Sequence, residues 1–260
     1  MKILAVSNQK GGVGKTTLST HLAYAASDKG LRVLLIDLDT QANASMMFEK
    51  KSDEINYLTS SDLFDETITN LPIEKALDNL WIIRAERESL TVILDSKSEE
   101  LSVCPSKVLQ PYSNQFDLCI IDCPPARGLL LMSALSLAQS VISPIDMCKF
   151  SIDAFAELLN DMEKVKKAGN NPSLKMLGAI GMKINTRSTT QMQQFSEFKE
   201  KYKEIVLPYF FPVREAVQAA INESRPVWTK VRGASHKKTA EEWRKYCDTI
   251  LAAVIGESNV

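Results

Sequence analysis

Lys10-Gly11-Gly12-Val13-Gly14-Lys15-Thr16-Thr17 lies between a short apolar run, Ile3–Val6, and a segment with helical periodicity. This order of strand, glycine-rich turn and helix is the structural context of a phosphate-binding loop. The glycines permit backbone angles that are closed to other residues, and their N–H groups, with the start of a helix, form an anion site. The stretch therefore predicts a nucleotide-binding α/β fold.

The residues inside this loop predict how it binds a nucleotide. We expect Lys15 to reach the β- and γ-phosphates and the Thr16 hydroxyl to ligate Mg²⁺. A dinucleotide-binding loop is excluded, because Thr17 stands where the G-x-G-x-x-G pattern needs its third glycine. The loop also departs from the usual phosphate-loop consensus, since Gln9 replaces its first glycine and a second lysine, Lys10, follows.

Short apolar runs alternate with amphipathic segments along the rest of the chain. This alternation predicts an α/β fold with a mostly parallel, twisted sheet and helices on both faces. The expected strands are Lys2–Ser7, Val33–Ile36, Leu80–Arg84, Leu118–Ile121, Ser140–Ile145, Met176–Ile184 and Ile205–Leu207. The expected helices are Leu18–Ser27, 127–138, 151–168, 189–202, 213–222 and 238–255. Residues 49–79 are expected to form loops and short helices, and residues 1–260 a single domain.

Composition excludes several classes of protein. The net charge of −1 over 260 residues argues against a chain that is basic throughout, although it leaves room for a local basic patch. The five cysteines are odd in number and form no C-x-x-C pair, which predicts reduced thiols in the cytoplasm. The sequence shows no secretory signal and no apolar stretch near the roughly 18 residues of a membrane span.

Three carboxylates end expected strands. Asp122 follows the apolar run Leu118–Ile121, so its side chain should emerge at the carboxyl edge of the sheet, where open α/β sheets bind ligands. We expect Asp122 to support Mg²⁺ through a water molecule. Asp37 and Asp39 follow Val33–Ile36 two residues apart, which places both side chains on one side of an extended segment.

The motifs resemble those of the ParA/MinD family of ATPases. The loop is similar to the family signature K-G-G-x-G-K-T-T. Leu34–Asn43 resembles L-L-I-D-x-D-P-Q-x-N, with Thr40 and Ala42 in place of the usual proline and glycine. Asp117–Pro125 is similar to the Walker B segment D-x-x-x-I-D-C-P-P. The resemblance covers the whole chain and is weakest over residues 49–110.

This resemblance implies a P-loop NTPase fold with a deviant Walker A loop, and ATP and Mg²⁺ as ligands. It assigns Asp39 to activating the attacking water and Asp37 to the surroundings of the magnesium ion. Lys10 would reach across a dimer to the partner's phosphates, with the logic of an arginine finger. Catalysis would then depend on Lys10, Lys15 and Asp39. The nucleotide would be held by Lys10, Gly11, Gly12, Val13, Gly14, Lys15, Thr16 and Thr17, and the metal by Thr16, Asp37 and Asp122.

Two further positions are implied as adenine contacts. The segment Lys183–Arg187 follows a strand where the family reads the base, which points to Asn185. The segment Phe211–Arg214 resembles a second turn beside the base, which points to Pro212. Both residues have an alternative role as simple caps of a strand or a helix.

A basic cluster lies near the C-terminus. Residues 225–245 carry seven lysines and arginines against two glutamates, so this segment is +5 and the rest of the chain −6. Such a cluster can bind phosphates without reading sequence. The candidate DNA contacts are Arg225, Lys230, Arg232, Lys237 and Lys238. A solvated basic face without a ligand is the alternative.

The expected function is that of a DNA-partition ATPase, which forms a homodimer with ATP and binds non-specific DNA on the nucleoid. A centromere-binding partner of the ParB kind would stimulate hydrolysis and release. The chain begins at its first strand, so we expect no N-terminal DNA-binding extension. The open alternative is a MinD-like or other positioning ATPase that acts on a protein or a membrane. A stable membrane anchor is not expected, because the last helix has a broad apolar face for packing and ends in an acidic tail.

Overall fold

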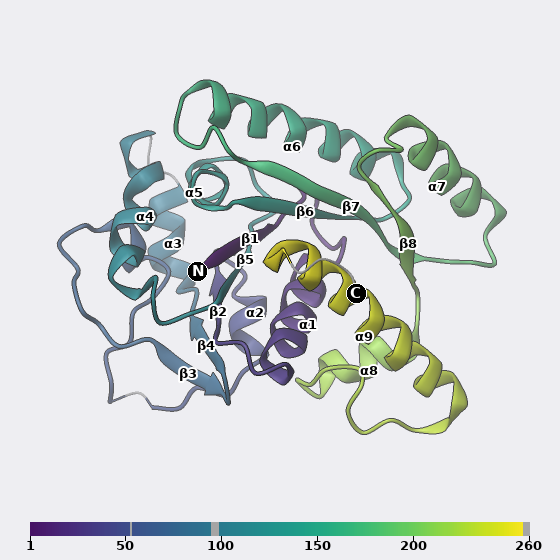
Figure 1. Ribbon diagram of the computed structural model, residues 1–260, viewed down its shortest axis with the longest axis horizontal. Helices are drawn as coiled ribbons and strands as arrows, with labels where there is room; N and C mark the ends of the chain where they lie inside the picture. Colours follow the sequence, from purple (N-terminus) through teal and green to yellow (C-terminus); the bar gives the residue numbers. More distant parts are fainter. Residues whose placement is uncertain (53, 95–98, 257–260) are drawn as a thin grey trace.

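The computed structural model describes residues 1–52, 54–94 and 99–256 (Figure 1). Its strands are β1 (Lys2–Val6), β2 (Val33–Asp37), β3 (Glu74–Leu77), β4 (Leu80–Ile83), β5 (Leu118–Asp122), β6 (Ser140–Ile145), β7 (Lys175–Ile184) and β8 (Val206–Pro212). Its α-helices are α1 (Lys15–Asp28), α2 (Asn43–Met46), α3 (Arg87–Leu94), α4 (Cys104–Leu109), α5 (Leu129–Leu137), α6 (Lys149–Lys167), α7 (Thr189–Lys201), α8 (Glu215–Asn222) and α9 (Gly233–Ile255). Short 3₁₀ helices lie at Asp62–Phe64, Glu99–Val103 and Gln110–Tyr112.

The strands form one sheet in the order β3-β4-β2-β5-β1-β6-β7-β8. All neighbouring pairs are parallel except β3 and β4, which are antiparallel. The carboxyl ends of β1, β2 and β5 therefore meet at one edge, where Val6 and Asp37 are both in register with Asp122. This edge brings the phosphate-binding loop and the strand-ending carboxylates together.

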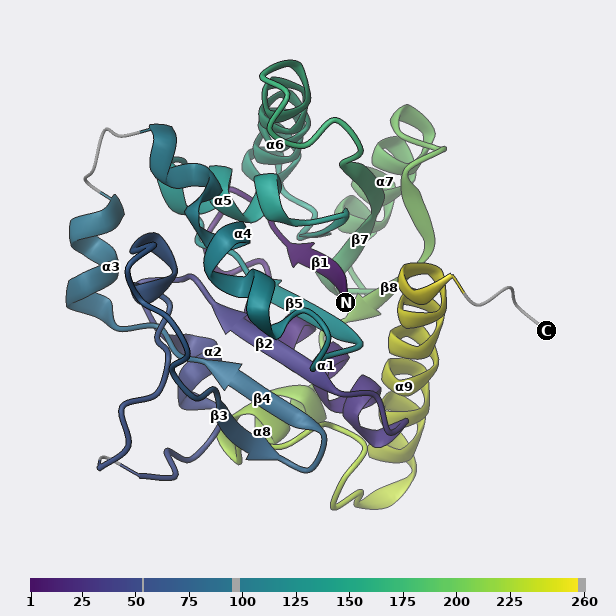
Figure 2. The same ribbon diagram turned by 60° about the vertical axis from the view of Figure 1, so that its left-hand side comes forward.

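The apolar strands divide their side chains between the two faces of the sheet. Ile3, Ile36 and Ile121 belong to one core cluster, while their neighbours in sequence, such as Leu35 and Ile120, belong to the other. Helices cover both faces: α5 and α6 pack on the first cluster, and α1 and α9 on the second (Figures 1 and 2). The expected mostly parallel sheet with helices on both faces is thus confirmed.

The expectation for residues 49–79 was wrong at its end, because the segment contains the edge strand β3. Glu74 faces inward and is buried, which breaks the apolar alternation that marks a strand. The buried carboxylate is satisfied by Arg84, whose Nε lies 2.6 Å from its Oε2. A charged pair in an inward position therefore hid this strand from the sequence pattern.

Two other boundaries differ from those expected by five residues each. Strand β8 continues to Pro212 rather than ending at Leu207. Proline cannot donate a hydrogen bond to a neighbouring strand, and the position of β8 at the edge of the sheet tolerates it for that reason. Helix α9 begins at Gly233 rather than at residue 238, and its first turn is exposed and polar. Such a turn lacks the apolar periodicity by which a helix is recognised.

Candidate nucleotide site

The phosphate-binding loop joins β1 to α1 through two glycines with positive φ. Gly12 has φ 77° and Gly14 has φ 101°, which is left-handed backbone that other residues adopt at a cost. At Gly14 a Cβ atom would also lie 2.9 Å from Cε of Met182. The left-handed conformation requires glycine there, whereas the contact with the end of the flexible Met182 side chain could be relieved by a small movement. Helix α1 then begins at Lys15, so its free N–H groups face the loop.

A cavity of about 470 Å³ opens in front of this loop. Its walls include Asp39 and six residues of the loop, Gly11, Gly12, Gly14, Lys15, Thr16 and Thr17. Val13, which the resemblance also assigned to the nucleotide, is buried and is not among the described residues that line the cavity. The remaining walls were not expected from the sequence; they include Met46, Met47, Pro125, Lys183, Ile221 and Ser224. A larger groove of about 870 Å³ runs along α9, but it carries none of the loop residues. The smaller cavity, which contains the phosphate-binding loop, is therefore the candidate nucleotide site.

Asp122 lies beneath the loop and is completely buried. It accepts hydrogen bonds from the Thr16 hydroxyl at 2.7 Å and from the Ser19 hydroxyl at 2.9 Å. Burial, with the nearby carboxylate of Asp37, raises the pKa of Asp122 to about 7. Because Thr16 donates its hydrogen to Asp122, the lone pairs of its oxygen are left to face a cation.

Asp37 and Asp39 take different positions at the end of β2. Asp37 is fully buried and accepts bonds from the backbone N–H and hydroxyl of Ser45, each at 2.8 Å. Burial raises the pKa of Asp37 to about 6. Asp39 lines the cavity instead, where the N–H of Gln41 holds its Oδ1 at 3.0 Å. Asp37 holds the segment between Asp39 and Ser45 in place, whereas Asp39 lines the cavity.

The two loop lysines point to different partners. Lys15 lines the cavity, and its Nζ donates to the carbonyl of Lys10 at 3.0 Å. Burial lowers the pKa of Lys15 against the attraction of nearby carboxylates. Lys10 is not among the described residues that line the cavity. Its Nζ lies 2.8 Å from Oδ2 of Asp146 and 2.9 Å from Sγ of Cys148.

The surroundings of Lys10 stabilise its protonated, positively charged form. Burial opposes that charge, but hydrogen bonds to Asp146 and Cys148 outweigh the effect and raise the pKa of Lys10. Asp146 follows β6 and also accepts a hydrogen bond from Ser151 on α6. Nothing in the sequence pairs Lys10 with a residue 136 positions away, so this contact could only come from the fold.

Lys183 is the first residue of the segment expected beside the base, and it makes a contact with the phosphate-binding loop that the sequence did not indicate. It lies near the end of β7 with φ 55°, and its Nζ donates to the carbonyl of Gly12 at 2.7 Å. The two expected adenine contacts, Asn185 and Pro212, are not among the described residues that line the cavity. Asn185 accepts a hydrogen bond from the N–H of Arg187 in its own turn. Both adenine contacts stay predictions.

The five candidate DNA contacts divide into two groups. Arg225 is mostly buried, with 11% of its side chain exposed, and binds Glu223 and the carbonyl of Thr229. Lys237 and Lys238 are exposed on the first turns of α9 and form no ion pair within the part of the chain that the structure describes. Lys230 and Arg232 are exposed on the preceding loop. Arg225 therefore shapes this surface, and the other four residues present charge on it.

None of the helices within residues 1–52, 54–94 and 99–256 combines the length and hydropathy needed to cross a bilayer. No disulfide bond joins any two of the five cysteines, all of which lie within the described residues: Cys104, Cys119, Cys123, Cys148 and Cys247.

Comparison with known proteins identifies the class to which this site belongs. A family model described as an AAA domain matches residues 1–176. The chain belongs to this family, and specifically to its ParA/MinD-type P-loop ATPases. Its relatives include a chromosome partitioning protein.

Three matches give the extent of this similarity. Protein IncC of Escherichia coli is 30% identical over 260 residues, covering 96% of this chain and 69% of its own. The chromosome partitioning protein ParA of Myxococcus xanthus is 31% identical over 217 residues, covering 80% and 75%. A plasmid partition protein of Borrelia burgdorferi, solved with AMPPNP bound, superposes with a TM-score of 0.77 at 23% identity and covers 99% of both chains.

Proposed function

We propose that this chain is a DNA-partition ATPase that binds ATP with Mg²⁺, dimerises, and binds DNA without sequence preference while the nucleotide is intact. The observation that carries this proposal is the division of the loop lysines: Lys15 lines the nucleotide cavity, and Lys10 lies outside it on Asp146. A single phosphate loop needs only one of these charges for its own nucleotide. The names of the relatives support the same reading.

The donor set at the loop fits a nucleoside triphosphate with Mg²⁺. Lys15 and the loop N–H groups would hold the phosphates, and the Thr16 hydroxyl would ligate the metal through the lone pairs that Asp122 leaves free. Bound Mg²⁺ would neutralise charge between the β- and γ-phosphates. Asp122 would support the metal through water, and Asp37 would fix the segment that carries Asp39.

Asp39 is the residue that we assign to the attacking water. Its side chain faces the cavity while Oδ1 is held by the N–H of Gln41, which leaves Oδ2 to orient a water molecule. A carboxylate that is held in one position lowers the entropy cost of placing that water in line with the γ-phosphate. Hydrolysis is expected to be slow until a second protein completes the site.

Lys10 would complete the site of a second copy of the chain. Both side chains of its ion pair with Asp146 reach solvent, with 29% and 28% of their surfaces exposed, so the pair can open without stranding a fully buried charge. The released ammonium would then stabilise phosphate charge across the dimer. Hydrolysis would remove that charge and weaken the dimer, and a ParB-like partner would act by promoting this step.

The DNA contacts would lie on the exposed part of the basic cluster: Lys230, Arg232, Lys237 and Lys238. These side chains can meet phosphates without reading bases, while Arg225 holds the loop in shape. We further propose that residues 1–260 act as one domain in the cytoplasm, associated with the nucleoid.

Binding to duplex DNA of random sequence tests this proposal. We expect binding with ATP and Mg²⁺ but not with ADP, and a steep fall in affinity between 50 and 200 mM salt, with a log–log slope of about −0.9 for each phosphate contact. The double variant Lys237→Ala, Lys238→Ala should reduce the slope by about 2. Lys199→Ala, Lys203→Ala, which removes the same charge from exposed positions at α7 and its end, is the matched control. Absence of ATP-dependent binding at low salt would overturn the proposal and favour a protein or membrane cargo.

A further inference from the structure

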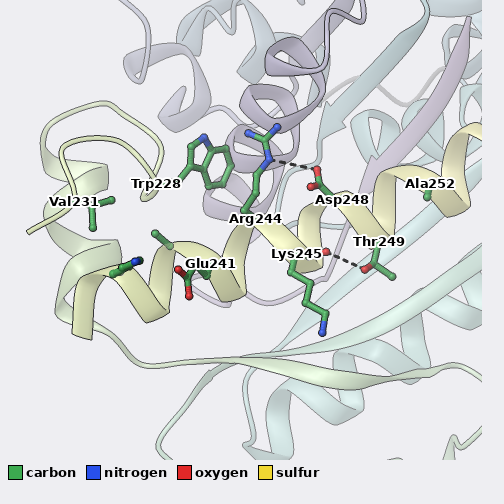
Figure 3. A pocket seen from close by; sticks show the side chains of 10 residues that line it. Trp228, Val231, Glu241, Arg244, Lys245, Asp248, Thr249 and Ala252 are labelled. Carbon is green, nitrogen blue, oxygen red and sulfur yellow. Dashed lines mark hydrogen bonds and ion pairs between the residues drawn. The ribbon is translucent and has the colours of Figure 1, made fainter. Parts of the chain in front are cut away.

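The loop between α8 and α9 touches two parts of the molecule that serve different ligands in the proposed function. Within this connecting segment, residues 223–232, Ser224 lines the nucleotide cavity. Trp228 and Val231 of the same segment line the groove along α9, and Figure 3 shows Trp228 next to Arg244 of that helix. The exposed basic residues Lys230 and Arg232 also belong to it. One short connection thus spans the distance from the nucleotide cavity to the basic surface.

Helix α1 holds this segment along one of its faces. The residues concerned, Thr17, His21, Tyr24 and Asp28, are spaced by four, three and four positions, which places them on a single helical stripe. The Tyr24 hydroxyl donates to the carbonyl of Ser224 at 3.2 Å, and Asp28 accepts from Nε1 of Trp228 at 3.0 Å. Because α1 starts in the phosphate-binding loop, a shift of its first turn would reach the connecting segment directly.

His21 makes the central contact of this stripe and is fully buried. The N–H of Val227 donates to its Nε2 at 3.2 Å, so Nε2 is the acceptor and Nδ1 carries the proton. Nδ1 then donates to the carbonyl of Thr17 at 2.7 Å. His21 therefore joins the end of the phosphate-binding loop to the middle of the connecting segment.

His236 continues the chain of hydrogen bonds on the other side of Val227. Arg232 donates its N–H to Nδ1 of His236 at 3.1 Å, which leaves Nε2 to donate to the carbonyl of Val227 at 2.8 Å. The only two histidines of the chain therefore bind the two backbone groups of one residue. The path runs from Thr17 through His21, Val227 and His236 to Arg232.

The backbone of the connecting segment is held in an unusual conformation. Ser224 has φ 49° and Lys230 has φ 50°, both in the left-handed region although neither is glycine. Such residues persist only where their surroundings fix them, and they are frequent in segments that switch. The segment is therefore positioned by its contacts with α1 and α9 rather than by its own preference.

We propose that His21 and His236 couple the nucleotide cavity to the basic surface, so that ATP bound at the loop sets the position of Lys230 and Arg232. The inference rests on the proposed function for the identity of the second ligand, DNA, but not for the coupling itself. Coupling of this kind is reciprocal: the factor by which ATP strengthens DNA binding is the factor by which DNA strengthens ATP binding. His21 and His236 are positioning residues in this account, since neither touches a ligand.

Hydrogen exchange measures the coupling without DNA. In the wild type, a non-hydrolysable ATP analogue with Mg²⁺ should slow exchange of the backbone amides of Val227 and Arg232. In His21→Leu and in His236→Ala this nucleotide-dependent difference should be lost, while exchange in the phosphate-binding loop still responds to the analogue. Thr249→Ala, which changes a hydroxyl beside the same groove but outside the hydrogen-bond path, is the matched control.

DNA binding gives the second readout. The ratio of DNA affinities with and without the analogue should fall at least about fivefold in both histidine variants and stay within twofold of wild type in Thr249→Ala. If His21→Leu fails to fold, the half-buried His236→Ala decides. Wild-type exchange differences in both histidine variants would overturn the inference. A wild-type protein that shows the exchange difference but binds no DNA would instead overturn the proposed function alone.

Discussion

The nucleotide cavity and the C-terminal basic surface hold their charged side chains in opposite ways. At the cavity, Asp37 and Asp122 are fully buried, and each accepts hydrogen bonds from named donors. On the basic surface, Lys237 and Lys238 are exposed. A buried charge that loses a partner costs several kcal/mol, whereas an exposed lysine can move freely. Residue identity is therefore fixed at the cavity, while at the surface mainly the total charge counts.

The largest expected difference between the cavity and the basic surface is the loss of ATP hydrolysis on substitution of Lys15. Lys15→Ala removes the charge nearest the phosphates, and ATP hydrolysis should fall at least ~10³-fold, about 4 kcal/mol of barrier. Basal hydrolysis of Lys237→Ala, measured in the same phosphate-release assay without DNA, should stay within twofold of wild type. Equal losses in the two variants would remove the distinction between the regions.

A smaller effect concerns the pH dependence of stability at the junction between the two regions. Burial lowers the pKa of His21 from 6.5 to about 4, so the folded protein binds fewer protons than the unfolded chain between these values. The stabilisation is present above pH 6.5 and is lost as the pH falls toward 4. At 1.36 kcal/mol per pH unit it amounts to about 3 kcal/mol.

Urea unfolding of wild type and His21→Leu at pH 7.5 and pH 5 measures this contribution. Asp37 and Asp122, whose pKa values are raised, act with the opposite sign in the same range, but they are present in both proteins. The wild type should therefore lose more stability on acidification than the variant. An identical change in both proteins would show that His21 is not buried in its neutral form.

Within the basic cluster, Arg225 and Lys237 should differ in how much they contribute to stability. Arg225 binds Glu223 and the carbonyl of Thr229, so Arg225→Ala should lower the free energy of unfolding by about 1–3 kcal/mol. Lys237→Ala should change it by less than about 0.5 kcal/mol. Thermal unfolding of both variants checks the pair, and a larger loss for Lys237→Ala would contradict the division of the cluster.

The sequence predicted the parts of the site that depend on local order. Strand, loop and helix around Gly14 follow from neighbouring residues, and so do the positions of Asp37 and Asp122 at the ends of β2 and β5. The different surroundings of Asp37 and Asp39, which the sequence placed on one side, depend on the fold. The contact of Lys183 with Gly12 could not be predicted, because it joins residues 171 positions apart and depends on a left-handed backbone at a lysine.

The basic cluster shows a second limit of the sequence. Arg225 and Lys237 look alike in a count of charges, but only the fold reveals that one is tied to a loop and the other is free to meet a ligand. Strand β3 illustrates the same limit in the sheet. Its inward glutamate breaks the apolar pattern of a strand, and only the fold shows that Arg84 pairs with it. Long-range pairing, rather than local pattern, decides these cases.

Sedimentation velocity with ATP and Mg²⁺ tests most directly the central claim that two subunits share each nucleotide. Asp39→Ala should block hydrolysis and sediment as a dimer with ATP and as a monomer with ADP. Adding Lys10→Ala to this variant should return it to a monomer with ATP bound, whereas adding Lys199→Ala on α7 should leave the dimer intact. A stable dimer of Lys10→Ala, Asp39→Ala would contradict the claim.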